Sequence, residues 1–168
     1  MYDHFVQKLV ETLEARVAVS SIRLITEQLV GSFVVERTVE IECRLTDGKD
    51  SPIALVHVFP MDDGETCELE VEVSFPVAQI TMEPKQFWDK AKEIYDQVAI
   101  KSYQRYFGTE TEPTDAEVML EYSKLVEIPD DPQFGGSELC WTEFLTEVES
   151  LGQEIVRFLR LTRYRSTT

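Results

Sequence analysis

Two stretches of sequence decide the fold: Phe33-Val-Val-Glu-Arg-Thr-Val-Glu-Ile-Glu-Cys-Arg-Leu45 and Cys67-Glu-Leu-Glu-Val-Glu-Val-Ser-Phe75. Both alternate apolar and polar residues, and a period of two is typical of a β-strand with one buried and one solvated face. Between them, Ile53-Ala-Leu-Val-His-Val-Phe59 is apolar on both faces. We therefore expect three consecutive antiparallel strands within residues 33–75.

Turn signals separate these three strands. Asp47-Gly48 lies between the first and second, and Asp62-Asp63-Gly64 lies between the second and third. Asp-Gly between alternating runs is typical of a hairpin, because glycine accepts the positive φ that such turns require. A β-branched run over residues 17–30 predicts one further strand before them. The sequence thus predicts a four-stranded antiparallel β-meander.

The remaining segments carry helical spacing, with apolar residues three and four positions apart. These spacings predict helices over residues 2–16, 84–107, 114–125 and 138–164. Pro84 suits a first helical position, Thr114 and Glu117 have the spacing of a capping box, and Ser137 suits an N-cap. The predicted fold class is α+β: the meander carries an N-terminal helix and C-terminal helices packed on the sheet, in a single domain over residues 1–168.

The last predicted helix carries an apolar seam of heptad spacing. Its members are Trp141, Phe144, Val148, Leu151, Ile155 and Phe158. A seam of this length is more often part of an intramolecular core than of a coiled coil. A homodimer through residues 138–164 is the alternative.

The net charge of -16 limits the classes of partner. Nucleic acid and anionic membranes are both negative, so we expect the chain to bind neither directly. The same charge favours a basic protein partner, although it could equally serve solubility alone. No apolar run is long enough to span a bilayer, and the amino terminus has no signal-peptide pattern.

Three cysteines are an odd and small number for a disulfide scaffold. We expect Cys43, Cys67 and Cys140 to be reduced and to act as small core residues. A cytoplasmic location follows as the expectation.

The sequence contains no recognisable catalytic constellation. Its histidines, His4 and His57, have no metal-ligand spacing around them, and there is no Gly-rich phosphate loop, Gly-x-Ser-x-Gly elbow or Cys-x-x-Cys. The acids of the turns at Asp62–Glu65 and Asp130–Asp131 lack the ligand order of an EF-hand. We therefore predict a protein that is not an enzyme and has no cofactor and no metal site.

The polar faces of the strands within 33–45 and 67–75 are mostly glutamate. The strand between them, Ile53–Phe59, is apolar on both sides, so it places apolar residues among these glutamates as well as in the core. Burial of this face by the protein's own helices is the commoner arrangement, whereas an open apolar stripe between acidic strands would be a binding surface. For the second case we predict a partner-binding surface. Its residues are Glu36, Glu40, Glu42, Val56, Val58, Glu68, Glu70 and Glu72.

Two functions remain in view. The first is a non-enzymatic acidic interaction module (an adaptor, a chaperone or an inhibitor of the immunity-protein type) that binds a basic protein partner. The alternative is a small-ligand-binding protein or enzyme with a pocket between the sheet and the helix over residues 84–107. Trp88, Tyr95, Tyr103 and His57 would line that pocket.

Overall fold

The computed structural model describes residues 2–30, 33–45, 52–61, 65–100, 117–130 and 132–163. Its secondary structure follows the order α1 (Tyr2–Glu14), β1 (Ala18–Val30), β2 (Phe33–Arg44), β3 (Ile53–Pro60), β4 (Thr66–Pro76), α2 (Pro84–Ile94), β5 (Ala99–Ile100), β6 (Glu117–Glu127) and α4 (Glu138–Leu159). Short 3-10 turns occupy Val77–Gln79, Pro132–Phe134 and Leu161–Arg163. The chain is therefore an α+β protein, as its sequence predicts.

All strands belong to one antiparallel sheet in the order β1-β2-β3-β4-β6-β5. The predicted meander over β1 to β4 is confirmed, with a register shift between Val19 and Ser21 in β1. The predicted strand number is wrong, because the sheet has six strands rather than four. The predicted hairpin turns at residues 47–51 and 62–64 lie outside the described residues.

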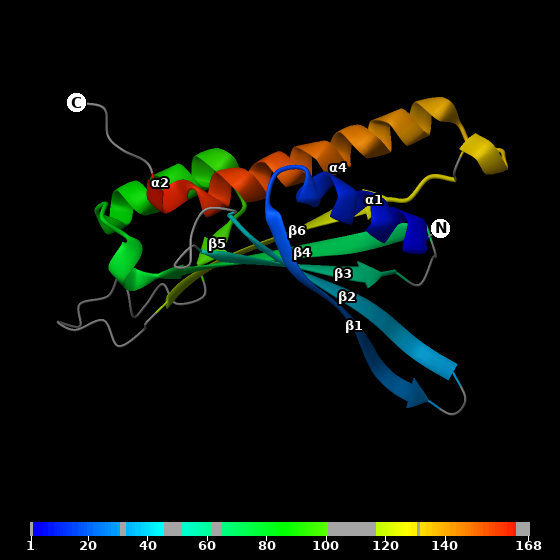
Figure 1. Ribbon diagram of the computed structural model, residues 1–168, viewed down its shortest axis with the longest axis horizontal. Coiled ribbons are helices and arrows are strands. Elements are labelled where there is room, and N and C mark those ends of the chain that lie inside the picture. The colour runs from blue at the N-terminus through cyan, green and yellow to red at the C-terminus, as the bar shows by residue number, and fades with distance from the viewer. Residues whose placement is uncertain are drawn as a thin grey trace.

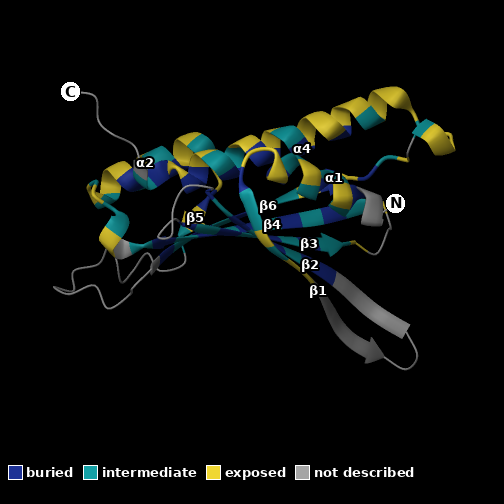
Figure 2. Cartoon of the chain, viewed as in Figure 1, coloured by how far each residue is buried: buried dark blue, intermediate teal, exposed yellow. Residues whose placement is uncertain are grey.

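The helices form a second layer over one face of the sheet (Figure 1). Helix α4 contacts both α1 and α2, and its middle lies over β3 and β6. Gly152 of α4 lies beside α1, where a Cβ would be in van der Waals contact with the Thr12 methyl group at 3.4 Å. Phe5, Leu9 and Leu13 of α1 are fully buried, so the predicted first helix packs one face on the rest of the chain. Figure 2 shows how burial varies along each element.

Helix α2 is shorter than the predicted helix over residues 84–107. It ends at Ile94 because Tyr95 is extended, and a turn at Asp96–Gln97 leads into β5. The Tyr95 ring then packs on Tyr122 with 4.6 Å between ring centroids. Residues 101–107 lie outside the described part of the chain. Tyr95, which suits a helix stripe, packs on a residue of the sheet instead.

The predicted helix over residues 114–125 is wrong, because Glu117–Glu127 forms strand β6. Its buried residues alternate with a period of two: Val118, Leu120, Tyr122 and Val126. The three- and four-residue spacing of Val118, Tyr122 and Leu125 was misleading, since Leu125 is 68% exposed on the other face. Pairing along the whole of β4 decides the conformation of this segment.

Helix α4 confirms the predicted last helix but ends at Leu159. Ser137 is its N-cap and accepts a hydrogen bond from the Cys140 backbone N–H. The heptad seam is buried within the chain from Phe144 to Phe158, and Phe144 packs on Phe5 of α1 at 5.4 Å. A second copy could not use this seam unless α4 first left its own core. Phe134, which precedes the helix, is 86% exposed and does not pack on the core.

Across the described part of the chain, every helix is too short or too polar to cross a lipid bilayer.

We expect Phe158→Ala to lower the free energy of unfolding by about 3–5 kcal/mol. Phe158 is fully buried and contacts the Tyr122 ring, with 5.3 Å between centroids, so truncation leaves a cavity between α4 and β6. Urea denaturation followed by circular dichroism measures the change. Leu139→Ala is the control in the same helix and should change stability by less than about 0.5 kcal/mol. Equal losses in both variants would contradict the assigned core.

Candidate functional site

The two faces of the sheet differ sharply in chemistry. On β3, Ala54, Val56 and Val58 are fully buried under the helical layer, while Leu55 and His57 are partly buried on the opposite face. The prediction that Val56 and Val58 contribute to a partner surface is therefore wrong. Among the described residues no helix covers the face that carries Leu55 and His57, which we call the open face (Figure 1).

Strand register brings the predicted glutamates together with β3 on the open face. One row across the sheet runs from Arg23 through Glu40 and His57 to Glu70. The next row places Leu55 between Glu42 and Glu72, and Glu121 of β6 lies beside Glu72. Glu68 pairs with Phe59 and Leu125. The side chain of Glu36 lies outside the described residues.

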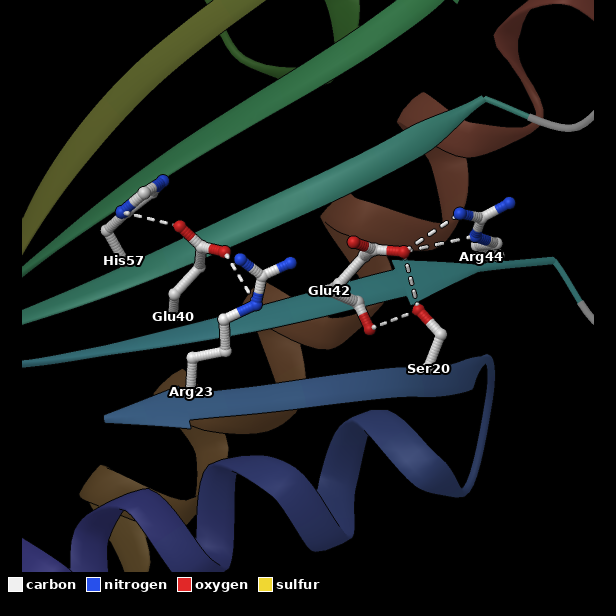
Figure 3. Close-up of polar contacts among 6 residues, drawn as sticks. All are labelled: Ser20, Arg23, Glu40, Glu42, Arg44 and His57. Carbon is white, nitrogen blue, oxygen red and sulfur yellow. Dashed lines mark hydrogen bonds and ion pairs between the residues drawn. The ribbon is translucent and has the colours of Figure 1, made fainter. Parts of the chain in front are cut away.

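The carboxylate of Glu42 is held by neighbours from its own sheet. It accepts hydrogen bonds from Arg44 Nη2 at 2.9 Å and from Ser20 Oγ at 2.8 Å (Figure 3). These bonds, with that of Arg44 first, lower the pKa of Glu42 below its ordinary value of 4.5. Its charge is thus largely compensated inside the protein.

Glu40 lies between an arginine and a histidine. Its carboxylate lies 3.9 Å from Arg23 Nε on one side and 3.9 Å from His57 Nδ1 on the other (Figure 3). The His57 ring stacks on Phe59 with 6.1 Å between centroids. His57 Nε2 is buried without a hydrogen-bond partner. The β2 side of the open face therefore carries both acids and their counterions.

The β4 side of the open face concentrates negative charge. Carboxylate oxygens of Glu70, Glu72 and Glu121 lie within 4.8 Å of one another, and all three side chains are partly exposed. Sequence reasoning missed Glu121, because its segment was assigned to a helix. The alternation from Val118 to Val126 was the signal that could have found it.

The residues of the alternative ligand pocket do not come together. His57 lies on the open face, whereas Trp88 and Tyr95 lie in the helical layer and over the sheet edge. Lys92 covers the Trp88 ring at 4.8 Å, and Phe75 packs edge-on against Phe87 at 5.4 Å under α2. Tyr103 is outside the described residues. Phe87 and Ala91 of α2 are fully buried on this side of the helix.

A groove of about 610 Å³ opens where β6 ends beside the first half of α4. Most of its polar lining is acidic: Glu65, Glu127, Asp130, Glu143 and Glu147. Leu125, Ile128, Pro129 and Phe144 supply apolar surface, and Thr66 and Cys140 complete the lining. Sequence reasoning missed this groove, because its residues come from segments far apart in the chain.

The three cysteines are free thiols in two different environments. Cys43 and Cys67 are fully buried, as the sequence predicts. Cys140 is exposed in the groove, so its prediction as a core residue is wrong. It lies in the first turns of α4, where all but one of residues 138–143 are exposed.

No family model, no curated protein and no solved structure matches this chain. Its function must therefore be inferred from the chemistry of its own surfaces.

We expect Glu42→Gln to destabilise the protein by about 1 kcal/mol at pH 7, because it removes a charged acceptor from Arg44 and Ser20. A lowered folded-state pKa means that this stabilisation is complete above pH 4.5 and is lost as the pH falls through the lowered value. Unfolding free energies at pH 7 and pH 3 measure the effect. An equal difference in unfolding free energy between wild type and variant at pH 7 and pH 3 would contradict the charge assignment. Glu93→Gln, at an exposed position of α2, is the control.

We expect a single cysteine, Cys140, to react with a thiol reagent in the native protein. The thiols of Cys43 and Cys67 have no exposed surface, and burial together with the nearby Glu42 carboxylate raises the pKa of Cys43 to about 12. Because the thiolate is the reactive form, modification of Cys43 should require unfolding. Mass spectrometry after iodoacetamide treatment identifies the modified residues. Modification of Cys67 or Cys43 at the rate of Cys140 would contradict the assigned burial.

Proposed function

We propose that this protein is a non-enzymatic interaction module whose open sheet face binds a basic protein partner. One observation carries the proposal: Glu70, Glu72 and Glu121 converge within 4.8 Å on a face where partly buried apolar side chains lie beside them. A group of carboxylates attracts the cationic side chains of a partner, and the apolar side chains beside it add contact area.

The partner surface proposed here is centred on β4 and β6 rather than on all the predicted glutamates. Arg23 and Arg44 lie beside Glu40 and Glu42, so a basic partner that approached β2 would meet charge of its own sign. Leu55 and Phe59 would supply apolar contact, which contributes affinity that charge steering alone does not. Acids around an apolar centre suit a partner with lysine or arginine around an aliphatic or aromatic residue.

We further propose that this partner is met in the cytoplasm. An exposed free thiol at Cys140 and buried free thiols at Cys43 and Cys67 suit a reducing compartment. Within this class the protein would act as an adaptor, a chaperone or an inhibitor, and the identity of the partner decides among these roles.

The test is capture of the partner from native cell extract, followed by quantitative mass spectrometry. We expect the wild type to retain a basic protein at about 50 mM salt and to lose it at about 500 mM, because screening weakens attraction between exposed charges. Charge reversal by Glu70→Lys with Glu72→Lys should abolish the capture.

Asp89→Lys with Glu93→Lys is the matched control. It changes the net charge by the same amount at two exposed positions of α2, away from the open face. Retention of the partner by the control but not by the sheet variant would support the proposal. Equal retention by both variants, or equal loss in both, would overturn it.

A further inference from the structure

Among the described strands, none pairs with the outer edge of β6 over its last residues. Strand β5 pairs with Leu120 and Glu121, and it runs antiparallel so that it leads away from the end of β6. In residues 117–130 and the other described segments, no strand lies beside the outer edge after Tyr122. An edge strand presents backbone N–H and C=O groups that can pair with another extended chain.

Helix α4 is held over the helix-facing side of β6 near Tyr122 and Lys124. Glu154 accepts hydrogen bonds from Tyr122 Oη at 3.3 Å and from Lys124 Nζ, and Lys124 also lies over the Tyr95 ring at 4.9 Å. Burial and the Glu154 carboxylate raise the pKa of Tyr122 well above its ordinary value, so its phenol stays a donor. This cluster holds α4 on β6, and the groove begins at the next residue of the strand, Leu125.

Beyond this cluster the groove follows the last residues of β6 along the first half of α4. Leu125, Glu127 and Ile128 line it on one side together with Glu65 and Thr66 at the start of β4, and Glu143, Phe144 and Glu147 line it on the other. Figure 1 shows the first part of α4 at the end of the sheet where β6 finishes.

The lining of the groove selects one charge. It contains five carboxylate side chains, at Glu65, Glu127, Asp130, Glu143 and Glu147, and no lysine, arginine or histidine. Its other side chains include the buried Ile128 and Phe144 and the exposed Leu125. Phosphate-rich ligands and acidic peptides would be repelled, whereas a cationic segment with apolar side chains would find both charge and contact.

From these features we propose that the groove binds an extended, lysine- or arginine-rich segment of a partner protein, which pairs with the open edge of β6. In an extended segment alternate side chains point to opposite sides. One set would reach Glu143 and Glu147 on α4, and the backbone would pair along Leu125–Glu127. The inference deepens the proposed function by adding a second contact, beside the open face, for the same basic partner.

The probe is a fluorescein-labelled peptide of four Lys-Val repeats, measured by fluorescence anisotropy at low salt with the full-length protein. Glu143→Lys with Glu147→Lys should weaken binding by about tenfold or more, because close charge pairs with the peptide are replaced by repulsion. Asp89→Lys with Glu93→Lys, which carries the same charge change on α2, should weaken binding by less than about threefold.

Strand pairing has its own test. A strand pairs through one edge, so N-methylation of either the lysines or the valines should abolish binding while N-methylation of the other set should not. The bound peptide should also protect Cys140, which lines the groove, from iodoacetamide. Spermine, a cation without a peptide backbone, should compete only weakly.

The proposal is overturned if the α4 and α2 variants weaken binding equally, if spermine competes as well as the peptide, or if neither N-methylated peptide loses binding. These outcomes leave the proposed function intact wherever partner capture still depends on Glu70 and Glu72. Conversely, peptide binding that survives Glu70→Lys with Glu72→Lys but not the α4 reversal places the groove contact apart from the open face.

Discussion

Burial of one face of β3 beneath α4 is the constraint on which the rest of the structure depends. Ala54, Val56 and Val58 lie on a central strand, and all three are fully buried in a core that also contains Leu151 and Ile155 of α4. Because successive strand residues point to opposite faces, this burial fixes which side of every neighbouring strand meets the helices. A one-residue slip would place the β2 and β4 glutamates in the core, at a prohibitive cost.

The same constraint forces the glutamates of three strands onto one surface, where the fold treats them in two ways. On β2, Arg44 and Ser20 hold Glu42, and Arg23 and His57 lie beside Glu40. On β4 and β6 the carboxylates of Glu70, Glu72 and Glu121 converge instead. This convergence gathers negative charge at one place on the open face, which suits the basic partner proposed above.

Strands with strict alternation can be predicted from the sequence. A segment whose conformation depends on pairing with a distant strand cannot. Phe33–Leu45 and Cys67–Phe75 are strictly alternating, so β2 and β4 follow directly, and the Ser137 cap and heptad seam define α4. Strand β6 was missed because a capping-box spacing and the positions of Val118, Tyr122 and Leu125 fit a helix equally well. Only a partner strand resolves that ambiguity, and β4 lies about fifty residues earlier in the chain. The groove could not be predicted from the sequence for the same reason, because Glu65 and Glu143 line it together only in the folded chain.

Placing β6 in the sheet also changes what the open face is. With four strands, β4 would be the exposed edge and its glutamates would protect it from pairing with other chains, as charged residues commonly do. With β6 beside it, β4 is internal, and its acids no longer protect an edge. Protection from pairing is now needed at the end of β6, where acids line the groove beside the first half of α4. Carboxylates beside an edge disfavour pairing with neutral and acidic chains but attract a basic one. The acids that oppose general aggregation therefore still allow a basic partner to bind.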